Sequence, residues 1–171
     1  CPHSYWLSSA GTYCKVDEKQ VDLYACGNEL DYFSKKHTGI GTFCHEFSHV
    51  LGLPDMYETT GNGTHKTLGA WSIMDYGPYN NEGNTPPAYS AYERFFMGWL
   101  SPQLIVDSAE MQLPELNSSN HAMLIAENDQ HNLIGNDPDT TVFYLLENRQ
   151  QSGWDEYLPG HGMMLTKVDY K

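Results

Sequence analysis

One short stretch, residues 41–55 (GTFCHEFSHVLGLPD), constrains this chain more than any other. Each residue of an α-helix advances by about 100°, so His45 and His49 lie one turn apart on the same face. Two imidazoles on one helical face can bind a small cation, and Zn²⁺ is the usual choice for nitrogen ligands. Glu46 lies at the edge of this face, where it can reach a metal-bound water without being a ligand. This is the arrangement of a general base beside a Lewis acid.

Two histidines do not complete a catalytic zinc site, which usually has three protein ligands and one open position. Gly52 permits a left-handed residue after the last helical turn, and Pro54 prevents the helix from resuming. The chain therefore turns back beneath the metal, and Asp55 is the first residue there with a metal-binding side chain. We predict His45, His49 and Asp55 as the ligands. The motif HExxH also occurs by chance in solvated helices, and the Gly-x-x-Asp extension makes that interpretation less favourable.

A second stretch, residues 71–77 (WSIMDYG), follows the first along the chain. The pattern HExxHxxGxxD followed by S-x-M-x-Y-G resembles the metzincin clan of zinc endopeptidases. In that clan a tight turn carrying a methionine lies beneath the metal, and the resemblance gives this place to Met74. Some metzincins use a tyrosine two residues later to stabilise the oxyanion, which implies that role for Tyr76. From the residues alone, Met74 is a core residue and Tyr76 a half-buried turn residue.

The resemblance extends to one family, the M6 (immune inhibitor A-like) peptidases. It is carried, in the family order, by GTFCHEFSHVLGLPDMYET, WSIMDYG, PPAYSAYERFFMGWLSP, LLENRQ and LPGHGMMLTKVDY, from about Trp6 to Tyr170. Lys167 departs from the family, which usually has a histidine or similar residue there, so no role is assigned to it. The resemblance implies an α+β, metzincin-like zincin catalytic domain. Its active-site helix and Met-turn are followed by a further helix and a β-rich C-terminal part.

The expected function is that of a zinc-dependent endopeptidase acting on a protein or peptide substrate. Glu46 would take the proton of a metal-activated water and pass it to the leaving amine, and zinc with Tyr76 would stabilise the oxyanion. One alternative is a non-catalytic zinc- or peptide-binding fragment, because the chain opens without the N-terminal strands and helix that a metzincin places above its cleft. Another is a gluzincin-type peptidase with Glu93 as third ligand, and Glu58 is a rival to Asp55.

Length and charge bear on the domain organisation, binding partners and location of the protein. A chain of 171 residues suits one domain with a sizeable core, so we predict residues 1–171 as a single catalytic domain. Because the chain starts at Cys1 without Met and ends in a strand, we expect a fragment of a longer protein, with a propeptide or further domains as candidate additions. A net charge of −13 argues against nucleic acid and against an anionic membrane surface. No apolar run is long enough to span a bilayer, and we expect an extracytoplasmic, secreted or cell-surface enzyme.

Two helices are expected. The first carries the zinc motif, with Thr38 or Thr42 as its cap and with four apolar residues on its buried side. The second covers residues 86–100, with Pro87 in the first helical position. The residues expected on the buried side of the first helix are Phe43, Phe47, Val50 and Leu51. Those expected to form a buried stripe on the second are Ala88, Ala91, Tyr92, Phe95, Phe96 and Trp99.

Strands are expected at both ends of the chain, with a turn at residues 27–28. Residues 128–139 form an acidic, turn-rich segment that makes Ca²⁺ a further candidate cofactor, although a plain surface loop is the simpler interpretation. The cysteines are either disulfide-bonded or free, and four of them permit three pairings. They are Cys1, Cys14, Cys26 and Cys44. The expected strands are residues 3–8 (with 4–7 in the core), one ending before Gly27, 103–107, 121–126, 141–147 and 162–169.

Overall fold

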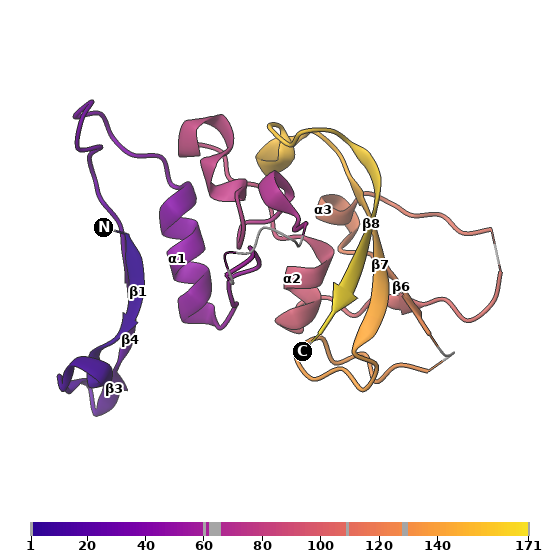
Figure 1. Ribbon diagram of the computed structural model, residues 1–171, viewed down its shortest axis with the longest axis horizontal. Coiled ribbons are helices and arrows are strands. Elements are labelled where there is room, and N and C mark those ends of the chain that lie inside the picture. Colours follow the sequence, from indigo (N-terminus) through magenta and orange to yellow (C-terminus); the bar gives the residue numbers. More distant parts are fainter. Residues whose placement is uncertain (1, 60, 62–65, 109, 128–129, 171) are drawn as a thin grey trace. The chain divides into compact units, whose positions relative to one another are not determined.

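The computed structural model describes residues 2–59, 61, 66–108, 110–127 and 130–170 (Figure 1). It contains both helices and strands, which confirms the mixed α and β class. The chain divides into two compact units, Cys1–Pro87 and Ala88–Lys171, which we describe one at a time. That residues 1–171 form one catalytic domain therefore stays a prediction. Within the described residues, no helix has the length and apolar character needed to cross a membrane.

The first unit begins with two short antiparallel pairs of strands. Strand β1 (His3–Trp6) pairs with β4 (Leu23–Cys26), and β2 (Cys14–Val16) pairs with β3 (Lys19–Val21). The expected strand over residues 3–8 ends early, because Leu7–Ala10 form the 3-10 helix η1. Its expected place in a core is wrong, since Trp6 is 53% exposed.

The hairpin of β2 and β3 was not expected. In its turn, Asp17 and Glu18 have φ values of 49° and 65°. These values lie in the left-handed backbone region, which residues other than Gly, Asn and Asp seldom adopt. Because neither residue is a glycine, the sequence lacks the usual signal for such a turn.

Helix α1 (Gly41–Leu51) carries the HExxH motif, as predicted. It ends at Gly52, whose φ of 114° is the left-handed conformation expected of a glycine cap. At its start, a side chain on Gly41 would collide with the carbonyl oxygen of Pro78, so glycine allows the helix to pack directly on the following backbone.

The predicted threonine cap of α1 is wrong. The residue before the helix is Ile40, and no side chain accepts a hydrogen bond from the first turn. The Thr38 hydroxyl is engaged elsewhere, since it donates to the carbonyl oxygen of Asn28.

The predicted buried side of α1 is also largely wrong. Strands β4 and β1 lie beside the helix (Figure 1). These short strands cover this side only in part, so Phe43, Phe47 and Leu51 remain 45%, 44% and 40% exposed. Val50 is half-buried, and the helix residues that are fully enclosed are small, namely Gly41 and Ser48.

After α1 the first unit continues through short turns rather than long helices. The 3-10 helix η2 (Gly69–Trp71) leads into a buried turn, and the 3-10 helix η3 (Gly77–Gly83) follows it. Ile73 and Met74 in this turn are 4% and 0% exposed, and Leu53, just beyond α1, is 2% exposed. The buried centre of this unit therefore lies where the end of α1 meets the turn around Met74.

The second unit begins with helix α2 (Ala91–Phe96), which is shorter than the predicted helix over residues 86–100. Pro87 does not occupy the first helical position, because Ser90 caps the helix instead. The Ser90 hydroxyl accepts from the Glu93 amide at 3.3 Å, and a Glu93 carboxylate oxygen accepts from the Ser90 amide at 2.5 Å. This reciprocal pair is a capping box.

A four-stranded sheet completes the second unit, in the order β5-β6-β7-β8. The predicted strands are confirmed in place: β5 (Gln103–Leu104), β6 (Met123–Ala126), β7 (Val142–Arg149) and β8 (Gly162–Asp169). Strands β5 and β6 are parallel, and the other neighbours are antiparallel. The short helices α3 (Leu116–Ser119) and η4 (Gly153–Asp155) were not predicted.

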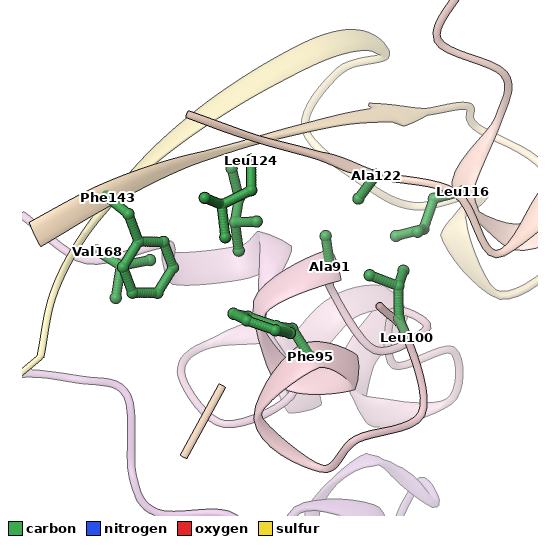
Figure 2. Close-up of a cluster of buried hydrophobic side chains, with 9 residues drawn as sticks. Ala91, Phe95, Leu100, Leu116, Ala122, Leu124, Phe143 and Val168 are labelled. Atoms are coloured by element: carbon green, nitrogen blue, oxygen red, sulfur yellow. The ribbon is translucent and has the colours of Figure 1, made fainter. Parts of the chain in front are cut away.

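One face of this sheet packs against α2 to form the core of the second unit (Figure 2). Ala91 and Phe95 of α2 point toward Leu124, Phe143 and Val168 of the sheet. This confirms Ala91 and Phe95 as members of the predicted buried stripe, whereas Trp99 is 42% exposed.

A buried ionic cluster lies in the same unit. The fully enclosed Arg149 donates to both carboxylate oxygens of Asp155, at 2.8 and 2.6 Å, and lies 3.6 Å from Glu147. The Glu147 carboxylate also accepts from the Ala91 amide at 3.0 Å, at the start of α2. Burial raises the pKa of Glu147 to about 7, although the nearby Arg149 acts in the opposite direction.

Candidate metal centre

The three predicted ligands come together in the structure. Oδ1 of Asp55 lies 3.3 Å from Nε2 of His45 and 3.2 Å from Nε2 of His49. One donor atom from each residue lies within 4.8 Å of the other two, and no other such group of three occurs among the residues with assigned positions. Helix α1 supplies the two imidazoles, and the turn at Gly52 returns the chain so that Asp55 faces them.

The other ring nitrogen of each histidine is held by a backbone carbonyl. Nδ1 of His45 lies 2.9 Å from the oxygen of Ile73, and Nδ1 of His49 lies 2.8 Å from that of Leu53. A carbonyl oxygen only accepts hydrogen bonds, so each Nδ1 carries a proton. In a neutral imidazole the lone pair is then on Nε2, the atom that faces Asp55.

These residues fit a metal ion. Two Nε2 lone pairs and a carboxylate oxygen converge, and Oδ1 of Asp55 is buried without a hydrogen-bond partner. Three acceptors with no donor between them repel one another unless a cation lies among them. Zinc ligands at about 2.0 Å in a tetrahedron are about 3.3 Å apart, which agrees with the separations of 3.3 and 3.2 Å. The donor set of two nitrogens and one oxygen is typical of zinc.

Glu46 lies beside this group and lines a pocket of about 300 Å³. Glu46 therefore shares this pocket with His45 and is open to a bound molecule. Tyr76 also lines the pocket, is 67% exposed and has its ring centroid 5.4 Å from that of Tyr79. The residues that line this pocket are Thr42, His45, Glu46, Tyr57, Asp75, Tyr76, Pro78 and Tyr79.

Met74 lies in a tight, buried turn that is hydrogen-bonded to the two segments carrying the candidate ligands. It is fully enclosed, its amide donates to the Ser72 hydroxyl at 3.1 Å, and its carbonyl oxygen accepts from the Met56 amide at 2.8 Å. The residue before it, Ile73, accepts the hydrogen bond from His45. The turn therefore contacts both the helix and the segment that carries Asp55.

Sequence reasoning missed one residue of this region, Tyr57. Its side chain lines the pocket beside Glu46, and its pKa is raised by burial and by the nearby carboxylate of Asp55. No sequence motif marks this residue, so its place beside the site becomes visible only in the folded chain.

The rival ligands do not join the group. Glu93 is fully buried and belongs to the capping box of α2. Glu58 is half-buried and lies outside the cluster of three donors. Cys44 precedes His45, and burial raises the pKa of its thiol, which disfavours the thiolate form that binds metals.

The calcium and disulfide expectations concern other segments. Residues 128 and 129 of the acidic segment lie outside the described residues. Within the rest of the segment, the Asn132 amide donates a hydrogen bond to the Asp139 carboxylate at 3.0 Å. The Asn132 side chain donates to the carbonyl oxygen of Asp137 at 2.7 Å. Calcium binding there stays a proposal. The cysteines with described positions, namely Cys14, Cys26 and Cys44, carry free thiols, and Cys1 lies outside the described part.

An HExxH helix with a converging carboxylate, next to a buried methionine turn in a mixed α and β chain, is the arrangement expected of a metal-dependent protease domain. Residues 7–100, more than half of the chain, match the family described as immune inhibitor A peptidase M6, catalytic domain. The chain belongs to this family, as its sequence motifs predicted.

Curated relatives agree with this assignment. The chain is 39% identical over 59 residues to the pre-pro-metalloprotease PrtV of two strains of Vibrio cholerae serotype O1, an alignment covering 33% of this chain and 6% of that protein. It is 36% identical over 70 residues to immune inhibitor A of Bacillus thuringiensis subsp. alesti, covering 39% of this chain and 10% of that protein. The matched part thus spans no more than about a tenth of the length of these relatives.

Proposed function

We propose that the chain is the catalytic part of a zinc-dependent endopeptidase. The observation that carries this proposal is the convergence of three lone pairs, from His45, His49 and Asp55, with Glu46 lining the same pocket as His45. A cation at that point would satisfy the otherwise unpartnered Oδ1 of Asp55. The name metalloprotease, carried by the Vibrio relative, supports a metal at this position.

A zinc ion held by these three residues supplies Lewis acidity, which lowers the pKa of water and favours negative charge on a carbonyl oxygen. Glu46 acts as the general base: it accepts a proton from the attacking water and then gives it to the leaving amine. Its carboxylate lines the pocket next to His45, so both proton transfers take place at one wall of the site. The backbone carbonyls of Ile73 and Leu53 hold the imidazoles in one tautomer and orientation.

Two further roles belong to the proposal. The Tyr76 hydroxyl donates to the oxyanion, because its largely exposed side chain lies in the same pocket as Glu46. Met74 forms an apolar floor beneath the imidazoles, in the manner of a metzincin. Its complete burial and the bonds of its turn to α1 and to the Asp55 segment support that role.

The setting of the enzyme follows from the same assignment. We propose an extracytoplasmic, secreted or cell-surface protein that acts on protein or peptide substrates. The words "pre-pro" in the name of the Vibrio protein support a propeptide as an additional segment in the full-length protein.

Zinc content and proteolysis, measured together on the purified chain, test the proposal. We expect about one zinc per chain by atomic spectroscopy, and casein cleavage that stops when a chelator removes the metal. Zinc without cleavage, in the chain and in the full-length protein alike, would support the alternative of a non-catalytic zinc- or peptide-binding domain. A chain that binds no zinc at neutral pH would contradict the ligand assignment.

A further inference from the structure

The pocket that Glu46 lines contains a second carboxylate, which no proposed step of the reaction uses. Asp75 lines this pocket and is only 6% exposed, whereas Tyr76 and Tyr79 of the same lining are 67% and 62% exposed. Asp75 therefore lies deep in the lining, and the two phenol rings lie near the opening. Among the residues that the structure describes, no lysine or arginine lines this pocket, so its character is acidic and aromatic.

The Asp75 carboxylate is held by the backbone of the turn around Met74. Its Oδ2 accepts a hydrogen bond from the Gly69 amide at 2.5 Å, and the carbonyl oxygen of Gly69 accepts one from the Tyr76 amide at 3.1 Å. These two bonds orient the carboxylate before any ligand arrives. A carboxylate has about four acceptor positions, so one amide leaves most of this capacity for a further donor.

The two walls of the pocket are also fixed relative to each other. Helix α1 supplies His45 and Glu46, and residues 75–79 supply the facing segment. These segments approach so closely that a Cβ on Gly41, at the start of α1, would collide with the carbonyl oxygen of Pro78. The pocket of about 300 Å³ is therefore formed by the fold itself and does not depend on a ligand for its shape.

We propose that Asp75 is a specificity-determining residue, and that this pocket takes the cationic side chain of a substrate lysine or arginine next to the bond being hydrolysed. This inference rests on the proposed function and deepens it, because it names the class of substrate residue. Glu46, the proposed general base, lines the same pocket. A side chain that enters the pocket therefore belongs to a residue close to the scissile bond.

The lining is complementary to a long basic side chain at both of its ends. The ammonium or guanidinium group donates charge-assisted hydrogen bonds to the buried carboxylate, and these are stronger than bonds between neutral groups. The aliphatic stem packs against the rings of Tyr76 and Tyr79, whose centroids are 5.4 Å apart. A neutral side chain would instead leave the Asp75 charge without a counter-ion, and an acidic one would be repelled. An aspartate at the base of a protease's substrate pocket selects basic residues by the same chemistry.

Cleavage of a random peptide mixture by the full-length protein gives the first test. We expect lysine and arginine to be enriched at one fixed position beside the scissile bond. Two peptides that differ only at that position then measure the preference, one with lysine and one with its uncharged analogue norleucine. The readout is the ratio of the two kcat/KM values, because a general loss of activity affects both peptides alike.

Asp75→Asn removes the charge and keeps the contacts of the turn, since the amide oxygen of asparagine still accepts from the Gly69 amide. We expect the ratio of lysine to norleucine cleavage to fall about 10- to 100-fold in this variant. The matched control is Glu82→Gln, which removes one negative charge from η3 at an exposed residue outside the pocket lining. It should leave the ratio within about 2-fold of wild type.

The control is needed because the chain has a net charge of −13, which attracts any cationic peptide. An equal fall of the ratio in both variants would overturn the inference, because the effect would then be one of overall charge. An unchanged ratio in Asp75→Asn would overturn it too. Binding of labelled peptides to the Glu46→Gln protein gives a readout without catalysis: the lysine peptide should bind more tightly than the norleucine peptide, and adding Asp75→Asn should remove this difference.

The same data distinguish this inference from the function beneath it. If the wild type binds zinc and cleaves the mixture without a basic preference at any fixed position, the inference fails and the peptidase assignment stands. If the wild type binds zinc and cleaves no peptide, the proposed function fails and the inference fails with it.

Discussion

Nδ1 of His45 and the carbonyl oxygen of Ile73 lie 2.9 Å apart, so a hydrogen bond joins helix α1 to the turn that carries Met74. This bond directs the lone pair of Nε2 toward Asp55. It also joins α1 to a turn that lies more than 20 residues further along the sequence. The helix alone therefore does not define the site, because the turn determines how the first imidazole is presented.

The first prediction concerns the general base. Glu46→Gln keeps the size of the side chain and removes its ability to accept a proton, so casein cleavage should fall by roughly 10²–10⁴-fold. Zinc content should stay at the wild-type value, because Glu46 is not one of the three converging donors. Full proteolytic activity in this variant would show that the mechanism is wrong.

The third ligand is tested by comparing two carboxylates. Asp55→Ala should lower zinc content strongly, because Oδ1 faces both imidazole nitrogens at 3.3 and 3.2 Å. Glu93→Ala should keep the zinc and instead destabilise the chain by roughly 1 kcal/mol, because it removes the capping box of α2. Atomic spectroscopy on both variants decides between them, and the reverse result would favour the gluzincin alternative.

Gly41 provides a test of how α1 is positioned. A Cβ at this residue would overlap the carbonyl oxygen of Pro78, so Gly41→Ala should lower the free energy of unfolding by roughly 1–3 kcal/mol. Gly27→Ala is the control, because a Cβ there meets the Phe43 side chain at an ordinary 3.9 Å. Urea unfolding measures both variants. Equal stability of the two would mean that the contact between α1 and Pro78 is not close.

Glu147 predicts a dependence of stability on pH. Burial raises its pKa from 4.5 to about 7, so the folded chain binds this proton more tightly than the unfolded chain. The stability that Glu147 contributes is therefore complete below about pH 4.5 and is lost as the pH rises through about 7. Urea unfolding of the metal-free protein across this range should show a smaller decrease for Glu147→Gln than for wild type.

The control for this measurement is Glu156→Gln, which changes an exposed glutamate of the same unit. It should keep the pH dependence of the wild type. If Glu147→Gln also keeps it, the buried carboxyl is not responsible for the change in stability.

Much of the candidate site could be predicted from sequence, because its donors lie on one helix and the turn after it. The 100° advance of a helix places His45 and His49 together, and Gly52 with Pro54 returns the chain to Asp55. Tyr57 was missed because no motif marks it, and only the folded chain places it in the pocket that Glu46 lines.

The fold was less predictable where local signals competed. The strands of the second unit were found because their β-rich runs are bounded by turns. The predicted length of α2 was too great, because Pro87 was taken as the start of the helix. The sequence also contains Ser90 followed three residues later by Glu93, which is the pattern of a capping box. The exposed Phe43 and Phe47 could not be foreseen, because periodicity identifies an apolar stripe and not whether the neighbouring strands cover it.

The three donor residues lie so close together in the chain that assembling them requires only one helical turn and a short return. The loop that must be closed is small, so its entropic cost is low even in an unfolded chain. A metal ion would therefore bind weakly to the denatured state as well as tightly to the native one. The stabilisation that it gives on folding is then smaller than its native affinity alone would indicate, and chelation would lower the melting temperature by correspondingly less.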